Sequence, residues 1–228
     1  MTHLLLLQAG DTTGVMSQAS SGQEVTILKL IMNGGLLMIP IGILSIIAIY
    51  IFIERLLVLK KAGNNPVKFF SQVKELITAG NIEGAKLLCR QTDSPISRMM
   101  EKGISRLGSS LKMIDVSIEN VGKLEIFKLE NGLATLAAVS GAAPMLGFLG
   151  TVTGMIRAFI AIAHEQGNVS PALLASGIYE AMVTTAAGLF VGIPAYIGYN
   201  YLVTKVSTIV HHMERTSVEF IDLLQEPK

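Results

Sequence analysis

Three long stretches of this chain are nearly free of charged residues. Two of them, 30–53 and 131–156, contain no charged residue, and the third, 172–204, contains only Glu180. Each is at least as long as the roughly 20 mostly apolar residues with which a helix crosses the hydrocarbon core of a bilayer. The pattern predicts three membrane-spanning helices, over residues 27–54, 131–163 and 172–204.

The segments between these stretches are polar. In 55–130 charged residues recur every few positions and apolar residues follow helical spacing, which predicts a soluble helical domain. Asn65-Pro66, Asn81 and Ser94-Pro95 are typical helix starts within it. The predicted fold class is therefore all-α, an integral membrane protein with a helical domain. The remaining segments are predicted as a polar leader, a short turn and a C-terminal helix with its tail, over 1–26, 164–171 and 205–228.

The basic residues indicate how the chain is oriented. All Lys and Arg except Lys29 and Arg157 lie in 55–130 or 205–228. The positive-inside rule places these two regions on the cytoplasmic side, and the N-terminus and the 164–171 turn outside. The net charge of +1 gives no reason to expect nucleic-acid binding.

Enzyme and metal-site motifs are missing from the sequence. It has no phosphate-binding loop, no HExxH motif and no nucleophile elbow, so we expect neither an enzyme nor a metal centre. The single cysteine, Cys89, offers no disulfide and no zinc site, and we interpret it as a small buried side chain.

Glu180 is the candidate functional residue, because a charge at the centre of a bilayer costs about 2.5–3.5 kcal/mol. It should face protein or a water-filled cavity. Thr184, Gly188 and Gly192 follow it at steps of four and form one stripe on a helix. Two interpretations stay open: the stripe lines a proton path, or it is a packing seam between helices.

The second and third spans should form a hairpin around the 164–171 turn. Folding back about this turn brings Arg157 near the depth of Glu180, and Thr151 near Thr185. A pair with Arg157 would keep the Glu180 carboxylate charged and would favour a structural or gating role. The small residues of the two spans are interpreted mainly as positions of close helix contact: Gly147, Gly150, Gly154, Gly188 and Gly192.

Two long motifs carry a resemblance to a known family. The second span contains APMLGFLGTVTGM at 143–155, and the third contains GIYEAMVTTAAGLFVGIPA at 177–195. These motifs resemble the MotA/TolQ/ExbB proton-channel family, and the likeness extends from about residue 29 to 224. Three spans with a cytoplasmic domain after the first fit ExbB and TolQ better than the four-span MotA.

The resemblance implies a role in the bacterial inner membrane, with a periplasmic N-terminus and a cytoplasmic C-terminus. ExbB-like proteins form a ring, taken to be a homopentamer, around an ExbD-like dimer. They conduct protons and pass the energy to a TonB-like protein that serves outer-membrane transport. The transported ion is the proton, and no cofactor is implied. The first span would face membrane lipid outside the ring.

The resemblance also implies site residues. Glu180, Thr151 and Thr185 would line the proton pathway, and the proton-binding aspartate would belong to the partner. The family pattern points to Thr185 whereas the helical stripe favours Thr184, and Arg157 is not part of the pattern. Thr184 and Arg157 are therefore expected as supporting residues. The alternatives are a TolQ-like subunit of the Tol-Pal envelope system, a self-sufficient ion channel, or a structural membrane scaffold.

Overall fold

The computed structural model describes residues 34–63, 66–164 and 171–225, so the predicted leader lies outside the described residues, as does most of the predicted turn. Within these ranges every regular element is an α-helix, as the all-α prediction requires. In chain order the helices are α2 (Met38–Ala62), α3 (Pro66–Thr78), α4 (Ile82–Gln91), α5 (Pro95–Ile104), α6 (Leu111–Glu130), α7 (Leu133–His164) and α8 (Pro171–Gln225).

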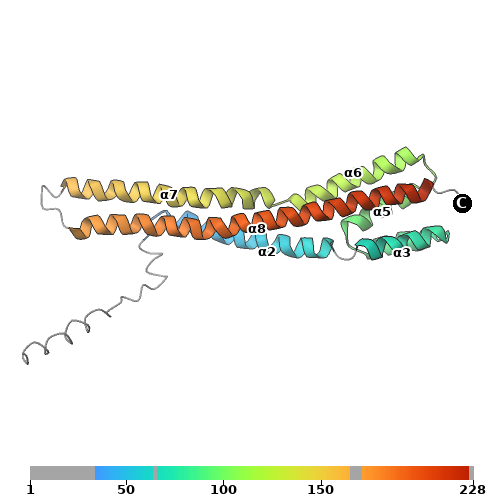
Figure 1. Ribbon diagram of the computed structural model, residues 1–228, viewed down its shortest axis with the longest axis horizontal. Helices are drawn as coiled ribbons and strands as arrows, with labels where there is room; N and C mark the ends of the chain where they lie inside the picture. The colour runs from blue at the N-terminus through green and yellow to red at the C-terminus, as the bar shows by residue number, and fades with distance from the viewer. Residues whose placement is uncertain (1–33, 64–65, 165–170, 226–228) are drawn as a thin grey trace, which may run out of the picture.

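Three helices, α2, α7 and α8, contain segments long and apolar enough to cross a membrane. This confirms the prediction of three spans. Figure 1 shows α7 and α8 side by side along the molecule, with α2 lying against α8. α8 is continuous over 55 residues, so the third span and the charged segment after it form one helix.

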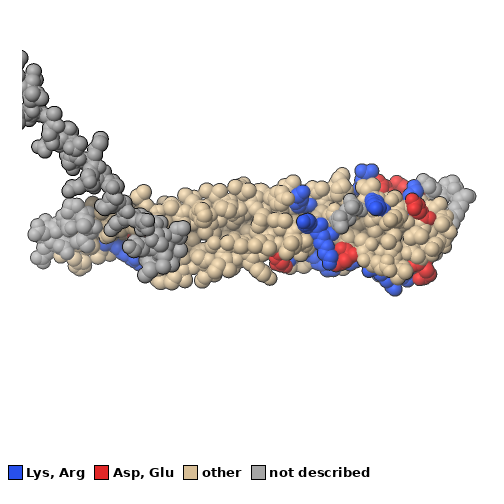
Figure 2. Space-filling model, turned by 90° about the horizontal axis from the view of Figure 1, so that it is seen from below, with Lys and Arg blue, Asp and Glu red and all other residues tan. Residues whose placement is uncertain are grey.

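The two halves of the molecule differ in how far their large hydrophobic side chains are buried. Large hydrophobic side chains in the apolar half are exposed, among them Phe148 at 68% and Phe190 at 81%. The charged half has a buried core that includes Met100, Ile118 and Phe220. Figure 2 shows Lys, Arg, Asp and Glu gathered over the end that holds this core. The apolar half thus has the surface of a protein surrounded by lipid or by further chains, and the charged half that of a small soluble domain.

The helix starts predicted at Asn81 and Ser94-Pro95 are confirmed, and α3 begins at Pro66, while Asn65 lies outside the described residues. The Asn81 side chain accepts a hydrogen bond from the Gly84 amide at 2.9 Å, and Ser94 caps α5 just before Pro95. α6 and α7 are separate helices, because the chain breaks at Asn131 and Gly132. Gly132 has a φ of +80°, which a side chain would disfavour. The break lies where the soluble domain meets the second apolar helix.

Candidate functional site in the membrane hairpin

Small residues let α7 and α8 approach each other until their backbones touch. A Cβ atom added at Gly188 would lie 2.5 Å from the carbonyl oxygen of Ala143, and one added at Gly147 would lie 3.0 Å from the carbonyl oxygen of Thr184. Gly150 and Gly192 likewise face the opposite helix with no room for a further side-chain atom, and a Cβ atom added at Gly154 would lie tightly against Ala181, at 3.1 Å. The five glycines therefore form one seam, as expected for close packing of membrane helices.

Arg157 on α7 and Glu180 on α8 form an ion pair across this hairpin. Arg157 Nη1 donates to Glu180 Oε1 at 2.9 Å, with side chains 59% and 27% exposed, respectively. Both residues line an opening of about 450 Å³ between the helices, together with Ala161 and Tyr179. Folding the hairpin back about its turn predicts this pairing, and the structure contains it.

The same carboxylate touches the segment that leads into α2. Gly35 has a φ of +68°, and a Cβ atom added to it would overlap Glu180 Oε1. The neighbouring Gly34 packs toward Val183 on α8. Gly35 is a site neighbour that the sequence interpretation missed. Its only signal is the Gly34-Gly35 pair at the start of an apolar run, which by itself is also typical of an ordinary turn.

The threonines of the two helices lie in different surroundings. Thr184 is 1% exposed in the seam, and its hydroxyl donates to the carbonyl of Ala181 on its own helix at 2.9 Å. Thr185 is half-buried and donates across the hairpin to the carbonyl of Gly147 at 3.0 Å. Thr151, one turn beyond Gly147, donates to the carbonyl of Phe148 at 2.7 Å. Thr184 thus lies in the packing seam between the two helices, whereas Glu180 lies at the opening beside Arg157.

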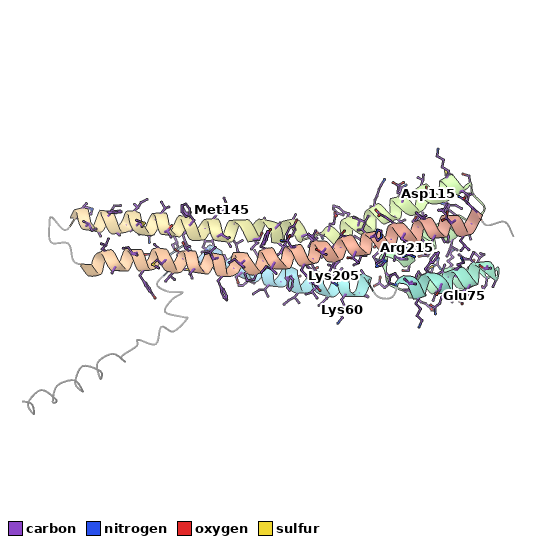
Figure 3. All side chains as sticks on the ribbon, in the orientation of Figure 1. Lys60, Glu75, Asp115, Met145, Lys205 and Arg215 are labelled. Atoms are coloured by element: carbon purple, nitrogen blue, oxygen red, sulfur yellow. The ribbon has the colours of Figure 1, made fainter. Side chains whose placement is uncertain are left out.

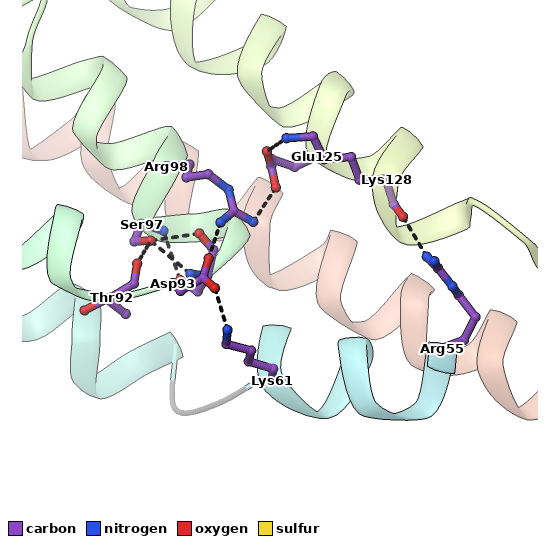
Figure 4. A network of polar contacts seen from close by, with 9 residues as sticks. Arg55, Lys61, Thr92, Asp93, Ser97, Arg98, Glu125 and Lys128 are labelled. Atoms are coloured by element: carbon purple, nitrogen blue, oxygen red, sulfur yellow. Dashed lines mark hydrogen bonds and ion pairs between the residues drawn. The ribbon is translucent and has the colours of Figure 1, made fainter. Parts of the chain in front are cut away.

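A second polar cluster lies where α2, α5 and α6 meet (Figure 4). The Glu125 carboxylate accepts from Arg98 at 2.6 Å and from Lys128 at 2.7 Å, and Asp93 pairs with Arg98 and Lys61. The Arg55 guanidinium, nearly buried, donates to the carbonyl of Lys128 at the end of α6. The sequence interpretation did not find this cluster, because its members come from three helices and the segment before α5, at irregular separations.

These salt bridges act on the pKa values of two carboxyls. Burial raises the pKa of the Glu125 carboxyl, but the hydrogen bonds from Arg98 and Lys128 outweigh it and hold the pKa below its usual range. Hydrogen bonds from Lys61 and Arg98 likewise lower the pKa of Asp93. Both carboxylates are therefore charged at neutral pH. Through these ion pairs and hydrogen bonds, the cluster links the C-terminal end of α2 to the soluble domain.

No group of three or more His, Cys, Asp and Glu side chains suited to a metal ion occurs in the described part of the chain. His211 and His212 are adjacent rings with centroids 6.5 Å apart. Cys89 is buried. Burial, and secondarily the charge of Glu101, raises the pKa of its thiol to about 12, so it is a poor nucleophile. None of these three side chains lines the opening beside Arg157 and Glu180.

Residues 91–215 match the model of the MotA/TolQ/ExbB proton channel family. The matched segment is more than half of the chain and contains the Arg157–Glu180 pair with the glycine seam. The chain is therefore a membrane protein of the proton-channel class. It belongs to the MotA/TolQ/ExbB proton channel family, the one that the two membrane motifs resemble.

Three relatives illustrate the range of the family. The chain is 27% identical over 190 residues to an ExbB homolog of Methanothermobacter thermautotrophicus, covering 83% of this chain and 67% of that protein. It is 34% identical over 127 residues to biopolymer transport protein ExbB of Neisseria gonorrhoeae, covering 50% and 57%. It is 38% identical over 100 residues to the Tol-Pal system protein TolQ of Haemophilus influenzae, covering 44% and 43%. The last two alignments span about half of each relative.

Proposed function

We propose that this chain is an ExbB-like subunit of an inner-membrane motor that is driven by the proton-motive force. Its partners would be an ExbD-like membrane protein and a TonB-like protein, and the work would be the energising of outer-membrane transport. The observation that carries the proposal is a charged pair, Arg157 and Glu180, at an opening between two apolar helices. Ionisable groups at such depth are costly and mark ion or proton routes.

In this proposal several chains form a ring, a pentamer, with the α7–α8 hairpins inside and α2 outside. Glu180, Thr151 and Thr185 then line the central cavity, and Thr184 supports the seam behind them. Each of the three lining residues keeps part of its surface exposed in the single chain, which leaves it available to a partner helix. The proton-binding carboxyl would come from the partner, because the Glu180 side chain is already engaged in its ion pair with Arg157. The pair then acts as a gate or a structural support.

The proposed orientation follows the charge distribution. The α3–α6 domain, over about 55–130, and the C-terminal part of α8 after 204 would be cytoplasmic, and the 164–171 turn and the N-terminus periplasmic. Among the described residues, Lys and Arg lie almost entirely at the end of the molecule that would be cytoplasmic. The transported ion would be the proton, and no enzymatic step belongs to this role.

Proton flux into liposomes tests the proposal. The chain is reconstituted into liposomes alone, and with an ExbD-like partner. The liposomes enclose a pH-sensitive dye, and a membrane potential is imposed. We expect flux only with the partner, and we expect its loss in Glu180→Ala while the ring stays intact by size-exclusion chromatography. Flux from the chain alone would instead indicate a self-sufficient channel. An intact complex with no flux would indicate a scaffold.

A second candidate is a TolQ-like subunit of the Tol-Pal system, favoured by the 38% identity to the Haemophilus protein over 100 residues. The two roles share the hairpin chemistry and differ in the partner that they engage. Capture of TonB-like or TolA-like proteins from a cross-linked membrane separates them. Exclusive capture of the TolA-like protein would overturn the ExbB-like role and leave the proton pathway in place.

A further inference from the structure

Two hollows follow one another along the contact between α2 and α8, and together they are called the groove here. Its apolar part encloses about 370 Å³ and is lined by Phe52, Ile53, Phe190 and Pro194, among others. The next part encloses about 310 Å³. Its lining includes the following polar side chains, over an apolar floor: Lys60, Tyr201, Lys205, Thr208 and His212.

The two parts lie on the same side of the helix contact. On α2, Lys60 follows Ile53 by two helical turns, and on α8, Tyr201 follows Pro194 by the same interval, so each pair shares a helix face. The Phe52 ring lies against Gly198 between them. The two hollows therefore lie in line on one face of the helix pair. The first is an apolar slot among the membrane-spanning residues, and the second is a basic hollow where charged residues begin.

The two lysines of the basic hollow, Lys60 and Lys205, have no acidic partner among the described residues. Lys61 pairs with Asp93 and Lys128 with Glu125, but no ion pair engages Lys60 or Lys205 in the described part of the chain. The Lys205 ammonium stands 5.6 Å above the centre of the Tyr201 ring, and both lysines are exposed. Figure 3 shows them at the same level along the molecule, one on each helix.

We propose that this groove binds a phospholipid with an anionic headgroup. The phosphate would lie between the ammonium groups of Lys60 and Lys205, with the Thr208 hydroxyl nearby. One acyl chain would occupy the apolar slot beside Phe52 and Phe190. Charge complementarity selects this occupant over a hydrophobic protein helix, since an apolar partner would leave two ammonium groups without counter-charge at a membrane boundary. The site does not depend on proton conduction.

Native mass spectrometry tests the proposal. The full chain is delipidated in detergent and then given equal amounts of phosphatidylglycerol and phosphatidylcholine. We expect the unaltered protein to retain phosphatidylglycerol in preference. The double variant Lys60→Gln/Lys205→Gln should lose roughly 30-fold of this preference, from about fivefold per basic residue near an anionic surface. The matched control Lys74→Gln/Lys112→Gln removes the same charge from exposed sites of the soluble domain and should keep the preference.

Two further variants separate loss of the lipid site from loss of folding. Lys60→Arg/Lys205→Arg retains the charges and should restore the preference, which a merely misfolded double variant would not explain. Ser45→Leu fills the apolar slot and should weaken retention of both lipids. The proposal is overturned if the glutamine pair retains lipid like its control, or if glycerol 3-phosphate displaces the lipid at equal concentration. It is also overturned if both lysines resist acetylation in the lipid-free assembly, because a second copy of the chain then covers the groove.

Discussion

Arg157 of α7 donates to the Glu180 carboxylate of α8 over 2.9 Å, and Gly35 packs against that same carboxylate from the segment before α2. All three apolar helices therefore meet, directly or through an adjoining segment, at one ion pair. Elsewhere in the described part of the hairpin, the glycine seam brings the backbones into contact, and the Thr185 hydroxyl donates across it to the carbonyl of Gly147. The pair is the point at which a change of charge would be felt by all three helices.

The two charges should be strongly coupled. Arg157→Gln or Glu180→Gln alone leaves the remaining charge without its counter-charge, whereas the double variant leaves neither. We expect a coupling energy of about 0.5–3 kcal/mol in a double-mutant cycle of unfolding in mixed micelles. Additivity of the two single effects would show that the pair contributes nothing. The same four proteins, tested for proton flux, report whether the pair gates conduction.

Gly35→Ala should disturb the carboxylate directly. The added Cβ would overlap Glu180 Oε1, and the backbone φ of +68° adds strain. Gly80→Ala is a matched control, because Gly80 has a φ of +76° with nothing within 4 Å of its added Cβ. Both should lose about 1 kcal/mol of stability through the backbone. Only Gly35→Ala should change carbodiimide labelling of Glu180, and equal labelling in both variants would contradict the contact.

The hairpin was the most predictable part of the site. A turn between two antiparallel helices fixes which residues share a depth, and this is enough to predict the pairing of Arg157 with Glu180. The rotation of each helix is harder to predict, because it depends on which side meets its neighbour. The stripe through Thr184 is buried in the seam, while Thr185 reaches across to α7. Whether Thr185 meets protons stays a prediction.

Other contacts depend on tertiary folding that periodicity does not report. Gly35 precedes the described helix α2, and nothing in its local pattern shows that it will lie against a residue 145 positions later in the sequence. The Arg98–Glu125 pair joins two helices of the soluble domain whose packing angle no spacing rule supplies. In contrast, helix starts at Asn81 and Ser94 are local chemistry, so the sequence predicts them well.

Gly188→Ala should weaken the hairpin. Its Cβ would lie 2.5 Å from the Ala143 carbonyl oxygen and 3.0 Å from Gly147 Cα, so the backbones must separate, at a cost of about 1–3 kcal/mol. Gly141→Ala is the control, because nothing lies within 4 Å of its added Cβ and the substitution should stabilise α7 by about 0.4–1 kcal/mol. Unfolding in mixed micelles measures both. Equal stability of the two variants would argue against the seam.

The Cys89 thiol should be nearly unreactive in the folded chain. It is 2% exposed, and its pKa is raised from 9.0 to about 12. The thiolate fraction at neutral pH is then about a thousandfold lower than that of a free thiol. Maleimide labelling should reach the rate of an engineered Ser71→Cys, at an exposed position of α3, only after denaturation. Fast labelling of the native chain would show that this part of the core opens readily.

The salt bridges of Glu125 should make the stability of the soluble domain depend on pH, with a loss in acid. The Glu125 side chain is 4% exposed, and Glu125→Gln leaves Arg98 and Lys128 without their shared carboxylate. We expect a loss of about 1–3 kcal/mol at neutral pH, less than for a fully buried pair because Arg98 keeps Asp93. Glu119→Gln on the same helix breaks an exposed pair with Lys123 and should cost at most about 0.5 kcal/mol.

The sign of the pH dependence follows from the lowered pKa of Glu125. The folded pKa lies below the usual 4.5, so the unfolded chain binds more protons between the two values and stability falls with decreasing pH. The contribution is complete above 4.5 and is lost as pH falls through the folded pKa. Unfolding curves of the original chain and Glu125→Gln should therefore differ at pH 7 and converge in acid. A constant difference across this range would mean that Glu125 stabilises through packing rather than charge.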